Sequence, residues 1–138
     1  MLRLAVLLAL TTPLAAEDMV WTDYDGSFED AAFSVEQAII GEGLVVDFVS
    51  DVGGMLARTA SDVGTPSPIE EGRVFLTCSA VVTREVLGAA PENIVYCPYA
   101  ITVLQTEGRV RIGRQDYPPS TMDPAEAMLD RIIEAANF

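Results

Sequence analysis

The chain has 138 residues, and its 21 acidic and 8 basic residues give a formal net charge of −13 at pH 7. A surface this negative repels nucleic acid and anionic lipid headgroups, so we expect neither as a partner. Histidine is absent, which excludes a His-dependent catalytic triad, a His-ligated haem and the usual catalytic zinc site. Any catalysis would depend on carboxylates, thiols, tyrosine, arginine or backbone groups.

Residues 1–16 have the pattern of a secretory signal peptide. A basic start at Arg3 is followed by the apolar run 4–10, and small residues precede the acidic Glu17. The apolar run is shorter than the about 20 residues that a membrane-spanning helix needs. We expect cleavage after Ala16, with Ala15 as the alternative, and a periplasmic or secreted product.

Residues 17–138 are long enough for one domain with a real core. Half of the chain is hydrophobic, which indicates a globular rather than a disordered protein. No stretch after residue 16 is apolar or long enough to cross a membrane, so we expect no membrane association.

Short β-rich runs alternate with amphipathic stretches along this domain. Strands are predicted at residues 20–24, 44–49, 73–78, 94–104 and 109–113, although Pro98 should break or bulge the fourth. Helices are predicted to begin after the capping residues Ser27, Asp51, Ser79 and Asp123, the last with Glu126 in a capping box. The hairpin turn at Glu107 favours an α+β fold with a mixed or antiparallel sheet and helices packed mainly on one face.

The two cysteines, Cys78 and Cys97, both lie on predicted strands, and three interpretations remain open for them. In an exported chain they could form a disulfide, worth about 3 kcal/mol in the chain-entropy model. They could instead be free core thiols, or a reactive pair, since the helix start at Ser79 favours a thiolate at Cys78. Because two cysteines without histidine are poor metal ligands unless two chains combine, we expect no metal and no cofactor.

Two further features carry a functional and a structural interpretation. Arg109 and Arg111 point to the same face of a strand, with Arg114 nearby, and could hold a carboxylate, sulfate or phosphate. Alternatively, they neutralise the surplus acidic groups or protect an edge strand. The pair Gly53 and Gly54 opens a predicted helix, where it admits either a ligand to the backbone or a close helix–sheet contact.

Four segments together resemble the DUF302 family, in particular an exported branch with two cysteines. They are Ser27–Asp30, Gly43–Val46, Phe75–Ala80 and Tyr96–Ile101. The resemblance covers roughly residues 20–117 and implies a compact α+β domain, often a homodimer, without an established activity. Cys78 and Cys97 are the positions that match, and the resemblance implies no catalytic residue.

Three hypotheses follow for the function. The first is a non-enzymatic exported accessory protein that binds a small ligand or a protein partner, with a candidate anion surface formed by Pro98, Tyr99, Arg109 and Arg111. The second is a thiol-dependent protein that handles sulfur species or redox equivalents through its two cysteines. The third is a structural disulfide in a domain that only contacts a protein partner.

Overall fold

The computed structural model describes residues 19–138, so the expected signal peptide at residues 1–16 lies outside the described part. Strands and helices follow one another in the order expected from the sequence. The strands are β1 (Met19–Tyr24), β2 (Val46–Asp51), β3 (Glu71–Thr77), β4 (Tyr99–Thr106) and β5 (Arg109–Gln115). The helices are α1 (Phe28–Gly41), α2 (Val52–Val63), α3 (Ala80–Ala89), the 3₁₀ helix η1 (Pro91–Tyr96) and α4 (Asp123–Ala136).

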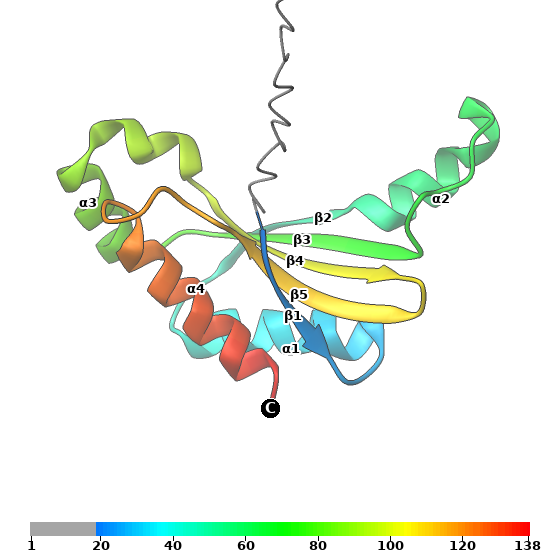
Figure 1. Cartoon of the computed structure of the whole chain (residues 1–138), viewed down its shortest axis with the longest axis horizontal. Coiled ribbons are helices and arrows are strands. Elements are labelled where there is room, and N and C mark those ends of the chain that lie inside the picture. The colour runs from blue at the N-terminus through cyan, green and yellow to red at the C-terminus, as the bar shows by residue number, and fades with distance from the viewer. Residues whose placement is uncertain (1–18) are drawn as a thin grey trace, which may run out of the picture.

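The five strands form one antiparallel sheet in the order β1-β5-β4-β3-β2. Helices α1 and α4 lie side by side beneath one face of it, which we call the inner face (Figure 1). The other, outer face carries no such helix layer, and α2 extends beyond the end of the sheet (Figure 1). The α+β class and the packing of helices mainly on one face are therefore confirmed. Within residues 19–138, no helix is long and apolar enough to cross a membrane.

The hydrophobic core fills the space between the inner face and the two helices. Alternate residues of each central strand point into it, as the two-residue period of a strand requires. Helices α1 and α4 supply apolar residues at the three- and four-residue spacing of a helix face. The fully or almost fully buried members include Val35, Ile39, Phe75, Tyr99, Ile101, Val103, Ile112, Met128, Leu129 and Ile132.

Local capping signals place three helix starts correctly. The Ser27 hydroxyl accepts a hydrogen bond from the backbone N–H of Asp30, and Asp51 and Ser79 cap α2 and α3 in the same way. The prediction for Asp123 is wrong, because Met122 occupies the N-cap position of α4 and makes no side-chain cap bond. Asp123 instead accepts a hydrogen bond from the backbone N–H of Ser120.

The predicted strand 94–104 is also wrong in its first part. Residues Pro91–Tyr96 form η1, and β4 begins only at Tyr99, after a cis peptide bond between Cys97 and Pro98. The buried Asn93 side chain donates a hydrogen bond to the carbonyl oxygen of Val86 in α3. This contact anchors η1 to α3, and it overrides the β propensity of the residues that follow.

A buried cation joins β5 to α4. The Arg114 side chain, on a residue only 7% exposed, points to the inner face and donates hydrogen bonds to Asp130 and to Glu126. The same Glu126 oxygen accepts the backbone N–H of Tyr117 at 3.0 Å. The bond to Asp130 raises the pKa of Arg114 above its ordinary value, so the guanidinium stays charged. Arg114 is therefore part of the core. Glu126 accepts a hydrogen bond from Arg114 and does not form the expected capping box with Asp123.

Helix α2 is attached to the sheet only at its base. Gly53 is its one buried residue, and a Cβ atom there would lie 2.6 Å from the backbone nitrogen of Gly72 and 3.0 Å from the Cα of Glu71. For Gly53 the packing interpretation therefore accounts for the glycine. At Gly54 a Cβ atom would collide with the capping carboxylate of Asp51.

Replacing Gly53 should therefore destabilise the fold. We expect Gly53→Ala to lower the free energy of unfolding by about 1–3 kcal/mol, because the added methyl group meets backbone atoms of β3 that cannot move independently. In the matched control Gly88→Ala, in α3, the new Cβ atom meets nothing within 4 Å, and the helix should gain up to about 1 kcal/mol. Urea unfolding of both variants measures the difference, and equal stabilities would contradict the close contact.

Removing the shared acceptor of Arg114 and Tyr117 should cost more than removing an exposed carboxylate. We expect Glu126→Ala to lower the free energy of unfolding by about 2–3 kcal/mol, because a buried guanidinium and a backbone N–H lose their partner. Glu134→Ala, on the exposed side of the same helix, should change it by less than about 0.5 kcal/mol. Thermal or urea unfolding checks this, and similar losses in both variants would argue against the buried network.

Candidate thiol site

The two cysteines lie close together at one end of the sheet, just outside the strands on which they were expected. Cys78 directly follows the last residue of β3, and Cys97 lies two positions before the first residue of β4, with Pro98 between them. Strands β3 and β4 pair antiparallel with Thr77 opposite Tyr99. This register brings Cys78 beside the segment Cys97–Tyr99. Both cysteines are free thiols in the structure, Cys78 exposed and Cys97 partly buried.

Polar groups from three elements surround the two sulfur atoms. The backbone N–H of Tyr99 donates a hydrogen bond to the Cys78 thiol. The Thr83 hydroxyl, from α3, lies 3.9 Å from the Cys97 sulfur and 3.4 Å from the Tyr99 hydroxyl. The thiols, one threonine and one tyrosine thus form a connected polar cluster where α3 meets the sheet.

The electrostatic surroundings of Cys78 favour the protonated thiol. Partial burial raises the pKa of Cys78, and the neighbouring Cys97 and the carboxylate of Asp47 raise it further. Only the hydrogen bond from the N–H of Tyr99 lowers the pKa of Cys78. The expectation that the helix start at Ser79 favours a thiolate at Cys78 is therefore wrong, because burial and neighbouring negative charge outweigh it.

Two buried tyrosines close the inner side of the cluster. Burial raises the pKa of Tyr99 to about 12 and that of Tyr117 to about 12. The rings of Tyr99 and Tyr117 meet edge to face, with 6.4 Å between their centroids. At neutral pH both hydroxyls keep their protons, so they act as hydrogen-bonding groups and not as general bases.

The residues of the expected anion surface are not brought together. Tyr99 is buried on the inner face at the beginning of β4, whereas Arg109 pairs with Thr106 at its end. The guanidinium of Arg109 donates to Asp23 at 2.9 Å, and that of Arg111 lies over the ring of Trp21, 4.9 Å from its centroid. The two arginines are thus engaged on the outer face, and the exposed Pro98 lies at the other end of β4.

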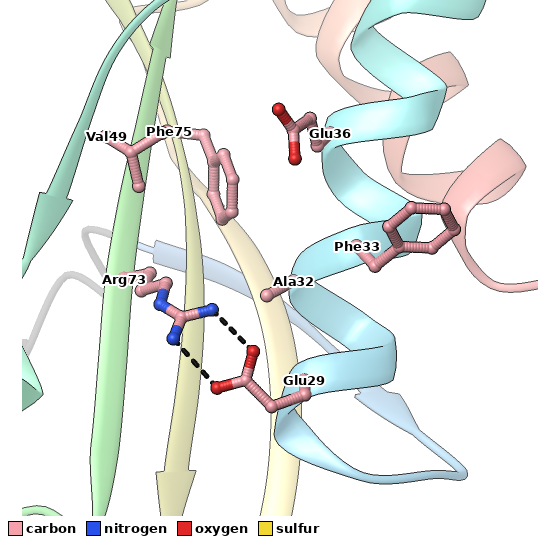
Figure 2. A pocket seen from close by; sticks show the side chains of 7 residues that line it. All are labelled: Glu29, Ala32, Phe33, Glu36, Val49, Arg73 and Phe75. Carbon is pink, nitrogen blue, oxygen red and sulfur yellow. Dashed lines mark hydrogen bonds and ion pairs between the residues drawn. The ribbon is translucent and has the colours of Figure 1, made fainter.

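A separate groove runs between α1 and the β2 side of the sheet (Figure 2). Its volume is about 320 Å³, and Phe75 and Val49 contribute its apolar wall. Arg73 and Glu29 face each other across it in a two-bond ion pair, both bonds 2.8 Å long (Figure 2). Because Glu29 already neutralises Arg73, the groove is a poor anion site despite its cation.

The sequence did not predict that Thr83 and Asp47 would lie next to the two thiols. Thr83 lies four residues after the capping Ser79, so it belongs to the first turn of α3, beside the sheet. Asp47 lies in the strand next to β3, where β2 pairs irregularly between Val46 and Phe48. The predicted elements contained both residues, but only the sheet order and register bring them to the cysteines.

The raised pKa predicts slow alkylation of an accessible thiol. At pH 7 we expect Cys78 to react with iodoacetamide more slowly than an unstructured cysteine, because less of it is thiolate. Asp47→Asn should speed the reaction by removing one negative charge, whereas Asp62→Asn, in α2, should leave it unchanged. Peptide mass spectrometry of the timed reaction measures the rates. Labelling of Cys78 faster than that of the unstructured peptide would contradict the electrostatic description.

Comparison with known proteins supports the fold found here. The sequence matches the family described as "Domain of unknown function DUF302" over residues 20–136. The crystal structure of an uncharacterized conserved DUF302 protein from Bacillus stearothermophilus superposes with a TM-score of 0.70 and 16% identity, over 88% of this chain and 97% of that one. At that identity the likeness concerns the fold alone. No protein with a curated description matches significantly. Because the family match covers nearly all described residues, the chain belongs to the DUF302 family.

Proposed function

We propose that this protein is an exported, non-enzymatic accessory protein of the two-cysteine branch, which acts by binding a protein partner. The observation that carries the proposal is α2, a helix with an apolar stripe and a single buried residue, Gly53. Val52, Leu56 and Val63 recur on one side of it, and Val63 is 69% exposed. An apolar helix face that its own domain leaves uncovered is typical of an interaction surface. The pattern of residues 1–16 supports export.

The outer face of the sheet offers the second half of this surface. Phe48, Leu76 and Ala100 stand in one row across β2, β3 and β4, opposite one another in the ladder. Phe48 is 60% exposed, and Leu76 and Ala100 are partly exposed. A contiguous apolar row on an uncovered sheet face needs a partner, because monomeric proteins rarely leave such a patch in water.

A second copy of the chain would cover both the apolar stripe of α2 and the apolar row on the outer face. Strand β2 ends at Asp51 and α2 begins at Val52 without a connecting loop, so α2 has no linker with which to turn back onto its own sheet. In a two-fold pair, each α2 would cover the outer face of the other chain, and both apolar surfaces would be buried by the same contact. The homodimer that the family resemblance implies agrees with this arrangement.

The oligomeric state tests the proposal. We expect light scattering after size exclusion to give twice the chain mass at micromolar concentration. Phe48→Glu should shift the protein to the monomer, because the charge would be buried in the interface. Val81→Glu is the matched control: Val81 is 76% exposed but lies on α3, so the dimer should persist. A wild-type monomer at all concentrations, or a dimer in the Phe48 variant, would contradict the two-fold pairing.

A second candidate function is thiol-dependent handling of sulfur species or redox equivalents. The closeness of Cys78 and Cys97 favours it, while the raised pKa of Cys78 disfavours a nucleophilic role at neutral pH. The same closeness supports a disulfide in the exported protein. Intact mass after alkylation, with and without prior reduction, separates a bridge from two free thiols.

A further inference from the structure

We propose that Cys78 and Cys97 together bind one Cu(I) ion per chain. The site is built by the β3–β4 register, which sets Cys78 beside the residues preceding β4, and by α3, which holds the Thr83 hydroxyl against the Cys97 sulfur. It lies at the end of β3 opposite the base of α2. The apolar row of the proposed dimer surface runs close to it, since Leu76 lies two residues before Cys78 and Ala100 three after Cys97.

The number and type of ligands select the metal. Thiolates are soft ligands, and soft ligands favour Cu(I) among the biological metals. A structural zinc site needs four ligands, and residues 19–138 contain no group of three or more Cys, Asp or Glu side chains placed to hold an ion. A monovalent d¹⁰ ion is satisfied by two thiolates, so a pair of cysteines without histidine is sufficient for it.

The charges around the site also favour a bound cation. Asp47, in the irregular stretch of β2 beside the end of β3, places a carboxylate near Cys78. That negative charge attracts a cation held between the two sulfurs.

Binding must release protons. Two S–H bonds break, two Cu–S bonds form, and two protons leave to solvent, with no change in the oxidation state of copper or sulfur. Below the thiol pKa values, the apparent affinity should therefore rise about 100-fold per pH unit, tenfold for each proton released.

Competition with the chromophoric Cu(I) chelator bicinchoninate, on reduced protein under nitrogen, tests the site. We expect one Cu(I) per chain, and at least a 100-fold weaker affinity in each of Cys78→Ser and Cys97→Ser. Thr83→Val should weaken binding about tenfold, as loss of a group that orients a metal ligand does. Met55→Leu, which removes an exposed sulfur on α2, is the control and should bind like the wild type.

Three results would overturn the proposal: no binding by the reduced chain, binding that survives loss of either cysteine, or half an equivalent per chain. The last would mean that the ion is shared between two copies. Phe48→Glu, the variant expected to be monomeric, should retain one Cu(I) per chain. This measurement keeps failure of the copper site distinct from failure of the proposed dimer. Circular dichroism of each cysteine variant shows whether the fold is retained.

Discussion

The antiparallel register of β3 against β4 is the constraint on which the other features depend. Seven consecutive pairs, from Glu71 opposite Gln105 to Thr77 opposite Tyr99, fix the two strands relative to each other. A slip of one residue would move every side chain of a strand to the other face. A slip of β3 would move Phe75 out of the core, a slip of β4 would move Tyr99 out of it, and either would separate Cys78 from Cys97. The same pairing thus sets the two faces of the sheet and the neighbourhood of the thiols.

The inner and outer faces of the sheet hold their arginines differently. Arg114 is buried on the inner face, whereas Arg111 lies on the outer face. Arg114 points inward and is neutralised by Glu126 and Asp130 of α4, which fixes that helix beneath the sheet. Arg111, three residues earlier in β5, points outward and lies over Trp21. One strand therefore supplies both the polar attachment of the helix layer and part of the uncovered face.

The sequence contains enough local information for most elements, but not for the contacts between them. The Ser27 and Asp30 pair identified the start of α1, because a cap acts over three residues. The β propensity of Ile94 and Val95 predicted a strand at these residues. In the structure, Asn93 holds the segment in η1 through a hydrogen bond to α3. The burial of Arg114 also depends on partners in another element. For α2, the apolar spacing was visible in the sequence, but the sequence did not show that Gly53 would be the only buried residue of this helix.

The net charge of −13 limits where two copies of this chain can meet. Like-charged surfaces repel, so association has to use apolar contact in a region of low charge. The outer face meets this condition, since Asp23 neutralises Arg109 and the row from Phe48 to Ala100 carries no charge. Asp47, next to Phe48 in β2, places one negative charge beside this row, where it attracts a cation toward the thiols.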